Sequence, residues 1–217
     1  MIALSKYLGI YEDFTKDFKS HGIKWSQPDS FNAFLNIVNN NHEGLKVWYR
    51  KAVTILADNE KLYLRFALLS GLRRTESIKA FNQIIELSKN GKLNEYYHKD
   101  LAILEHYKYK WSLRNTKNCF ITVISKELIT EISQSKPISY GTLREHLARN
   151  KLTIMIKLLR SYYATYLNKH GIQSETIDIL QGRVSKSVFA RHYLKESLST
   201  LSSQILPLQI KMLESIQ

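Results

Sequence analysis

The 217-residue chain carries a formal net charge of +13, and 44% of its residues are hydrophobic. That composition can supply one substantial core, with room for a small appendage. No apolar run approaches the ~20 residues that cross a bilayer, and the first four residues are too short an apolar block for a signal peptide. Cys119 is the only cysteine, which excludes an intramolecular disulfide and a cysteine-rich metal site. We therefore expect an intracellular, reducing location.

The positive charge is unevenly distributed along the chain. Residues 1–60 carry seven basic and seven acidic side chains, whereas residues 143–195 carry ten basic and three acidic ones, a balance of +7. Such a basic segment is expected where a polyanion docks. A generally basic soluble surface is the alternative that composition leaves open.

Helical spacing of apolar residues dominates the chain from its start. The pattern predicts a helix over residues 4–20 and, after the break at residues 25–30, a second helix that ends at Val38, with Asp29 or Ser30 as its N-cap. A polar linker over residues 39–44 follows. We therefore predict a short N-terminal region, residues 1–44, ahead of a body formed by residues 45–217.

The body is predicted to be mainly α with a small antiparallel β-sheet, an α+β fold. Alternation predicts a strand over residues 107–113, and β-branched and aromatic residues predict a second over residues 119–125. The basic, turn-rich residues 114–118 between them would form a hairpin tip that carries cations. The predicted helices are residues 45–57, 60–70, 75–88, 140–150, 152–169, 174–180, 187–192 and 197–215.

Arg73 opens a predicted helix within Gly71-Leu72-Arg73-Arg74-Thr75-Glu76. A guanidinium at a helix N-terminus lies where anions are already favoured, and its planar fork can hold two phosphate oxygens. Glu76, one turn further on, could brace the arginine. An ordinary surface salt bridge is the competing interpretation of this pair.

Lys157 and Arg160 are three residues apart, so on a helix they share one face and could touch a single phosphate. A solvated basic stripe is the alternative. A similar spacing, His146-x-x-Arg149, lacks a long apolar helix after it, and we interpret it as a solvated helix face.

Lys117, Arg183 and Tyr193 complete the candidate set. An ammonium on a hairpin tip could protonate a leaving oxygen; Lys110, Arg114 and Lys126 compete with Lys117 for that role. Arg183 follows a glycine that allows close backbone approach. Tyr193 lies ten residues further on and could act as a nucleophile, or it could be a packed aromatic that anchors the last helix.

Taken together, these segments resemble the catalytic domain of tyrosine recombinases, in particular the integrases of archaeal spindle-shaped viruses. The boxes occur in the family's order over about residues 45–195: Gly71-Leu72-Arg73 with Glu76, the hairpin Lys117, Lys157-x-x-Arg160 in place of His-x-x-Arg, Leu180-Gln-Gly-Arg183, and Tyr193. The lysine at 157 and the arginine at 183 depart from the superfamily pattern as this viral branch does.

The resemblance implies site-specific DNA strand exchange without metal or other cofactor. Tyr193 would attack the scissile phosphate to form a 3′-phosphotyrosyl link, and Arg73, Arg160 and Arg183 would hold that phosphate with added charge from Lys157. Double-stranded attachment-site DNA and a recombinase tetramer are the partners implied. The first 44 residues are fewer than the family's usual separate DNA-binding domain.

Three other functions remain open from the sequence: a type IB topoisomerase, an inactive DNA-binding protein and a plain helical scaffold. The apolar C-terminal tail, residues 197–217, also has two interpretations. It could pack on the chain's own core or dock into a neighbouring protomer, with Pro207 as a kink or hinge.

Overall fold

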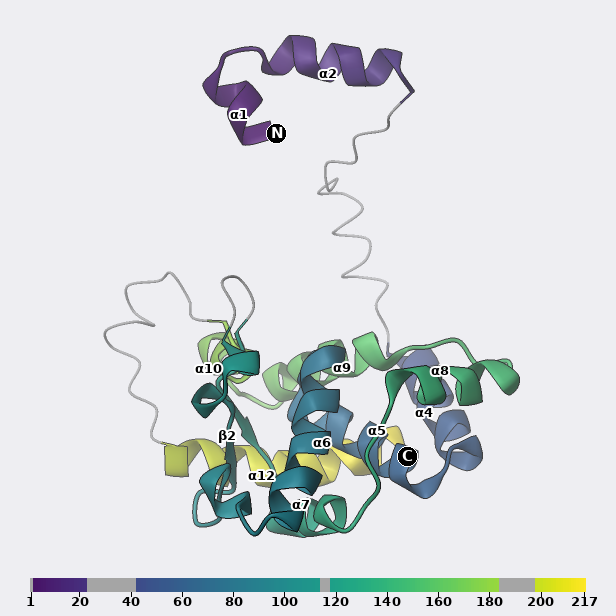
Figure 1. The fold of residues 1–217 in the computed structure, drawn as a ribbon, viewed down its shortest axis with the longest axis vertical. Coiled ribbons are helices and arrows are strands. Elements are labelled where there is room, and N and C mark those ends of the chain that lie inside the picture. The colour runs from purple at the N-terminus through teal and green to yellow at the C-terminus, as the bar shows by residue number, and fades with distance from the viewer. Residues whose placement is uncertain (1, 23–41, 114–117, 184–197) are drawn as a thin grey trace. The chain divides into compact units, whose positions relative to one another are not determined.

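The computed structural model describes residues 2–22, 42–113, 118–183 and 198–217 (Figure 1). The chain divides into two compact units, Met1–Asn41 and His42–Gln217. In the first unit, helices α1 (Ile2–Tyr7) and α2 (Tyr11–Ser20) replace the single helix predicted over residues 4–20. Gly9 separates them because its φ of +70° lies in the left-handed region, which a helix cannot include. The helix predicted to end at Val38 lies outside the described residues.

Helices form most of the second unit, and most of the predicted ones are confirmed to within a few residues. Two boundaries differ: α4 begins at Glu43, inside the predicted polar linker, and α9 begins at Ile156 instead of Leu152. Helix α7 was not predicted at all. The helices are α4 (Glu43–Ile55), α5 (Asp58–Ser70), α6 (Arg74–Lys89), α7 (Lys126–Ser133), α8 (Tyr140–Arg149), α9 (Ile156–Lys169), α10 (Ser174–Leu180) and α12 (Leu198–Ile216).

Two of these helices begin with the same local device. The carboxylate of Glu60 accepts a hydrogen bond from the Ala57 N–H at the start of α5, at 3.0 Å. At the start of α6 the Glu76 carboxylate accepts from the Arg73 N–H at 3.1 Å. Each glutamate thereby satisfies a backbone donor that the first turn of a helix leaves without a partner.

The α5–α6 connection is fixed by a glycine. Gly71 ends α5 with a φ of +60°, and a β-carbon there would lie 2.3 Å from the Tyr163 ring of α9. Only glycine satisfies both the backbone conformation and the close contact. The loop that leads to Arg73 is therefore held against α9.

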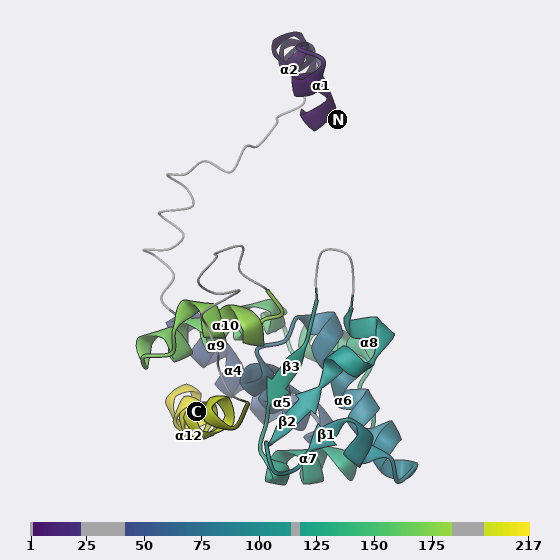
Figure 2. The ribbon, with the colours of Figure 1, turned by 90° about the vertical axis from the view of Figure 1, so that its left-hand side faces the viewer.

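A three-stranded antiparallel sheet lies beside the helices, in the order β1–β2–β3 (Figure 2). Its strands are β1 (Tyr97–His98), β2 (Ile103–Glu105) and β3 (Ile121–Val123), with Ile103 opposite Val123 and Tyr97 opposite Leu104. The strand predicted over residues 119–125 is thus confirmed at its centre.

The strand predicted over residues 107–113 is wrong. Two 3₁₀ turns, η2 (His106–Lys108) and η3 (Lys110–Ser112), occupy most of that segment. The Ser112 hydroxyl stabilises them by donating to the carbonyl oxygens of His106 and Tyr109. Backbone bonds from Tyr107 to the Phe120 carbonyl and from Cys119 to the Ser112 carbonyl still hold the segment beside the start of β3. Most of the predicted cationic tip, residues 114–117, lies outside the described residues.

A buried polar network crosses this part of the sheet. The His106 ring lies 2.6 Å from the Tyr96 hydroxyl through Nδ1 and 2.7 Å from the Thr122 hydroxyl through Nε2. Burial lowers the pKa of His106 to about 3. The ring is therefore neutral at physiological pH, with one nitrogen donating and the other accepting.

The core of the second unit includes the C-terminal helix. Ile205, Met212 and Ile216 of α12 are fully buried, and the Gln209 amide donates to the carbonyl oxygens of Leu69 and Val123 at 2.9 and 2.8 Å. Figures 1 and 2 show α12, in yellow, against the helices and the sheet. The hypothesis that this apolar face docks into a neighbouring protomer is therefore wrong, because the chain's own core covers it.

Pro207 was predicted to kink or interrupt the last helix. It does not interrupt α12, which continues through Pro207. The helix is held by buried side chains on both sides of the proline.

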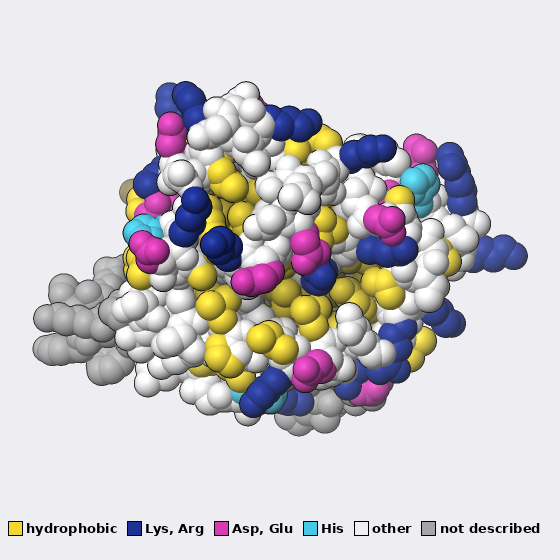
Figure 3. All heavy atoms as spheres, turned by 90° about the horizontal axis from the view of Figure 1, so that it is seen from below, with side chains coloured by type: hydrophobic (Ala, Val, Ile, Leu, Met, Phe, Trp, Pro, Cys, Tyr) yellow, Lys and Arg dark blue, Asp and Glu magenta, His cyan; other side chains and the backbone are white. Residues whose placement is uncertain are grey.

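Figure 3 shows apolar side chains that reach the surface on the underside of the molecule. A hollow of about 500 Å³ between α5, α7 and α12 includes Leu128, Leu206 and Ile210 in its lining.

In the part of the chain that the structure describes, no helix is long and apolar enough to span a membrane. Over the same residues, no group of three His, Cys, Asp or Glu side chains is arranged to hold a metal ion.

Candidate active site

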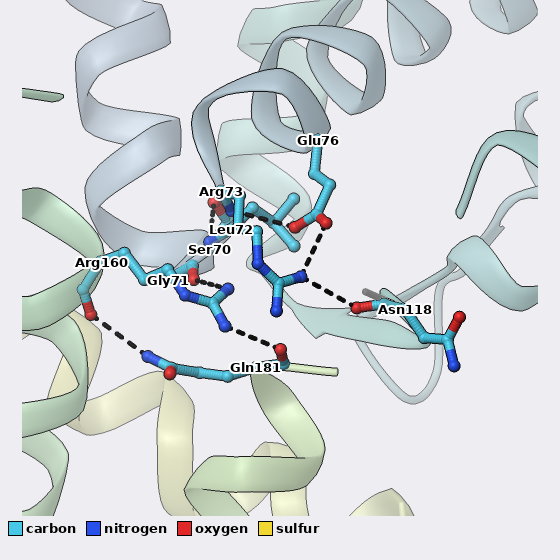
Figure 4. Close-up of polar contacts among 8 residues, drawn as sticks. All are labelled: Ser70, Gly71, Leu72, Arg73, Glu76, Asn118, Arg160 and Gln181. Atoms are coloured by element: carbon cyan, nitrogen blue, oxygen red, sulfur yellow. Dashed lines mark hydrogen bonds and ion pairs between the residues drawn. The ribbon is translucent and has the colours of Figure 1, made fainter. Parts of the chain in front are cut away.

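Arg73 and Glu76 form the first half of the candidate site (Figure 4). Arg73 Nη1 donates to Glu76 Oε1 at 2.8 Å and to the Asn118 carbonyl oxygen at 3.1 Å. The Glu76 side chain is only 2% exposed, whereas that of Arg73 is 25% exposed. The contact predicted between the two is present, and it is not an ordinary surface salt bridge because the carboxylate is buried.

Arg160, in the second turn of α9, forms the second half. Its Nη1 donates to the Gly71 carbonyl oxygen at 2.9 Å, and its Nη2 donates to the Gln181 carbonyl oxygen at 2.8 Å. The Gln181 amide returns a hydrogen bond to the Arg160 carbonyl oxygen at 3.2 Å. One guanidinium thus joins the α5–α6 loop, α9 and the end of α10.

Gly182 brings the end of α10 against the segment that contacts Arg73. Its φ is +68°, and a β-carbon at this position would lie 1.9 Å from the Asn118 carbonyl oxygen. The close approach expected at this glycine is therefore observed. Arg183, the next residue, is exposed and pairs with Asp178 at 3.1 Å.

The electrostatics of the cluster favour an anion. Burial is the main cause that lowers the pKa of Arg160 to about 10, and repulsion from Arg73 and Arg183 lowers that pKa further. A group with this pKa is still protonated at neutral pH, so Arg160 is a second cation beside the Arg73–Glu76 ion pair, and the Glu76 charge only partly offsets the repulsion. A phosphate between them would relieve the repulsion and accept from planar donors.

A groove of about 680 Å³ opens beside these arginines. Four cationic side chains line it, together with Tyr140 and other residues: Arg73, Arg74, Lys157 and Arg160. Lys157 is exposed and Arg160 half-buried. The prediction that these two residues share one face is confirmed, since both line the same groove.

The sequence did not reveal the parts played by three backbone carbonyls. Those of Gly71, Asn118 and Gln181 accept hydrogen bonds from the arginines. Only the two glycines, Gly71 and Gly182, gave a signal, because each marks a place where two segments approach closely. A carbonyl acceptor has no residue type that could identify it.

The interpretation of His146 as part of a solvated face is wrong. Its Nδ1 lies 2.8 Å from the buried Glu60 carboxylate, which ties α8 to the start of α5. Arg149 fits the prediction, because it is exposed and paired only loosely with Glu145 at 3.6 Å. Neither residue lines the groove.

Lys117 and Tyr193 lie outside the described residues, as does the short helix predicted over residues 187–192. The structure thus brings together Arg73, Glu76 and Arg160, with Lys157 along the same groove. Arg183 adjoins this cluster through Gly182 and through its electrostatic effect on Arg160.

Residues 39–201 match the family model of the archaeal phage integrases. This match covers most of the chain, and the chain belongs to that family. Every predicted site residue lies within the matched range. Neither the curated proteins nor the solved structures include one that matches the chain significantly. Membership in an integrase family implies that the protein binds DNA.

Proposed function

We propose that the chain is a tyrosine recombinase that integrates DNA by cleaving and rejoining strands through a 3′-phosphotyrosyl intermediate. The observation that carries this proposal is that Arg73 and Arg160 line the same groove. Three segments far apart in the sequence bring these two cations to one groove despite their mutual repulsion. Fixed donors of this kind stabilise the charge that develops on a phosphate during transfer.

The roles of the remaining residues follow from the chemistry of phosphodiester transfer. The Tyr193 oxygen attacks the phosphorus, the bond to the 5′-oxygen breaks, and the tyrosine proton is lost to a base. Lys117 gives a proton to the leaving 5′-oxygen. Arg183 and Lys157 add positive charge, and Glu76 braces Arg73. A 5′-hydroxyl of a partner strand then reverses the step and releases the tyrosine.

The same proposal covers fold, domains and partners. Residues 45–217 form the catalytic domain, with the DNA-breaking and rejoining fold of tyrosine recombinases, and residues 1–44 form a helical lead-in. Four protomers assemble on double-stranded attachment sites to exchange strands. The helical body with a small antiparallel sheet supports this assignment.

A covalent adduct is the direct test. The protein is incubated with a pool of nicked duplexes of random sequence, and DNA that stays attached after denaturation is captured, sequenced and resynthesised as a defined substrate. Wild-type protein is expected to give a shifted band on a denaturing gel. Tyr193→Phe should give none and still bind DNA, because only the nucleophilic hydroxyl is removed.

Tyr107→Phe is the matched control, because it removes the same hydroxyl from a different tyrosine, which is exposed. Tyr107 lies in η2, which precedes residues 114–117 in the chain. It should form the adduct at the wild-type rate. An adduct that persists in Tyr193→Phe would move the nucleophile elsewhere. Relaxation of supercoiled DNA without resolution of a four-way junction would favour a topoisomerase, and binding without any adduct would favour an inactive DNA-binding protein.

A further inference from the structure

Arg74 is the one cation among the four in the groove to which the proposed function gives no role. It is exposed at the first residue of α6, immediately after Arg73. No carboxylate forms an ion pair with Arg74 among the residues that the structure describes. The groove therefore contains a cation whose charge no neighbouring acid in the described chain neutralises.

The Arg74 guanidinium is nevertheless positioned. Its Cζ lies 4.1 Å from the centre of the Tyr140 ring, at the start of α8. Stacking on an aromatic face stabilises a guanidinium. It leaves the N–H donors, which point outward in the guanidinium plane, available to an acceptor in the groove.

Helix α6 also fixes the segment that carries Tyr140. The Asn82 side chain donates to the Ile138 carbonyl oxygen at 2.9 Å and accepts from the Ile138 N–H at 2.8 Å. Ile138 is buried and lies two residues before Tyr140. Arg74 and the ring beneath it are thus both held by α6, so their relative position does not depend on side-chain contact alone.

We propose that Arg74 binds a DNA backbone phosphate other than the cleaved one, and that Tyr140 is the positioning residue that holds its guanidinium. This inference rests on the proposed function, which assigns Arg73 and Arg160 to the cleaved phosphate. A backbone contact carries no base recognition. Arg74 therefore adds affinity and fixes the register of the duplex in the groove.

The test measures binding of the full chain to a fluorescent random-sequence duplex by anisotropy over a series of salt concentrations. Arg74→Ala should bind more weakly, with a salt slope about 1 smaller than that of wild type, because one phosphate contact is lost. Lys89→Ala, which removes the same charge from the other end of α6, should keep the wild-type slope. Urea unfolding of each variant checks that the fold is retained.

Tyr140 is tested by two substitutions. Tyr140→Leu should reproduce the weaker binding and smaller slope of Arg74→Ala, whereas Tyr140→Phe keeps the aromatic face and should restore the wild-type values. If Tyr140→Leu proves unfolded, Arg74→Gln, which keeps a polar side chain and removes the charge, must show the smaller slope on its own.

A wild-type slope in Arg74→Ala, or an equal loss in Lys89→Ala, overturns the proposal for Arg74. A wild-type slope in folded Tyr140→Leu overturns the positioning role. The outcome is separate from that of the adduct assay: wild-type protein that never forms an adduct contradicts the proposed strand cleavage, whereas the slopes measure the phosphate contact alone.

Discussion

At the scale of single residues, the site orients its arginines mainly with backbone carbonyls. Arg160 donates to two carbonyls, and Arg73 donates to one carbonyl and to Glu76. A carbonyl oxygen orients a guanidinium and leaves its positive charge in place, whereas a carboxylate orients the guanidinium and also neutralises it. The cluster is therefore rigid and still positive, which is the state that a phosphate ligand requires.

The acid role that we propose for Lys117 predicts a specific chemical rescue. Lys117→Ala should cleave an ordinary substrate slowly, because the 5′-oxygen then leaves without a proton. It should cleave a substrate with a bridging sulfur at that position at close to the wild-type rate, since a thiolate leaves unprotonated. Single-turnover adduct formation on the two substrates measures the difference.

Arg73→Ala is the control for this rescue. Loss of one fixed donor to a developing anion typically lowers the rate about 10²–10³-fold, and sulfur substitution should not restore it. Equal impairment of Lys117→Ala on both substrates would reassign Lys117 to phosphate binding and leave Lys110, Arg114 or Lys126 as the acid.

Alanine substitutions at Gly182 and Gly91 measure how much the close contact between Gly182 and Asn118 matters for stability. Both have a φ near +70°, but a β-carbon at Gly182 would lie against the Asn118 carbonyl, whereas one at Gly91 has nothing within 4 Å. Gly91→Ala should lower the free energy of unfolding by about 1–2 kcal/mol from backbone strain alone. Gly182→Ala adds a clash that costs about 1–3 kcal/mol more.

Gly182→Ala should also slow adduct formation, because Asn118 and Gln181 orient the two arginines. Urea unfolding and adduct rates are measured for both variants. Equal losses in the two variants would show that the contact at Gly182 has no bearing on the site.

At the scale of elements, the sequence predicted long amphipathic helices well and the sheet poorly. The helix predicted over residues 75–88 is observed as the 16-residue α6, because its apolar residues recur at helical spacing over several turns. Strands β1 and β2 have two and three residues, too few to show an alternation. Residues 107–113 do alternate between apolar and polar, but they form 3₁₀ turns in which only some of the apolar side chains are partly buried.

The site was predictable where it depends on side-chain type and order. Arg73, Glu76, Lys157 and Arg160 could be selected from the sequence because charge at helical spacing has a direct geometric meaning. The Gln181 carbonyl and the Tyr140–Arg74 stack could not, since they depend on how segments distant in sequence pack together. The contact between the His146 ring and the Glu60 carboxylate could not be predicted either, for the same reason.

The polar network of the sheet predicts a pH dependence of stability. The pKa of folded His106 is lowered by burial to about 3, below the 6.5 of an exposed histidine. Above about pH 6.5 the His106 ring is neutral in both the folded and the unfolded chain. As the pH falls below that value the unfolded state takes up a proton first, so the free energy of unfolding should decrease by up to about 1.4 kcal/mol per pH unit.

Urea unfolding between about pH 6.5 and 5 measures this slope, above the range in which carboxylates titrate. His106→Gln should show a shallower slope whatever its absolute stability. His42, whose pKa is also lowered, chiefly by burial, contributes in the same direction and remains in the variant. An unchanged slope in His106→Gln would mean that His106 is not the buried neutral group.

Deletion of residues 203–217 should unfold the second unit. Ile205, Met212 and Ile216 are fully buried, and the loss of each such side chain costs about 2–5 kcal/mol against a total stability of about 5–15 kcal/mol. Circular dichroism and denaturant titration of the truncated chain test this. Ile210→Ser, on the exposed side of the same helix, should have little effect, and a truncated protein that stays folded would contradict the assignment of α12 to the core.

At the scale of the whole molecule, every residue of the buried hydrophobic core in the described part of the chain lies between Leu45 and Ile216. A fragment of residues 42–217 should therefore unfold at the same denaturant midpoint as the full chain. Helices α1 and α2 have six and ten residues, below the about 12–15 that isolated helices need, so a peptide of residues 1–22 should show little helix by circular dichroism. A lower midpoint for the fragment would show that residues 1–41 stabilise the body.

Under the proposed function, the two hydrogen bonds of Arg160 also bear on when the protein first becomes able to cut DNA. They connect residues separated in sequence by 89 and 21 positions, and contacts that close long loops form late in folding. During synthesis, a chain that has reached only α6 has Arg73 but neither Arg160 nor Gln181. The nascent protein thus cannot assemble the paired arginines, and under the proposed mechanism it cannot nick the nucleic acid around it, until most of the second unit has been made and packed.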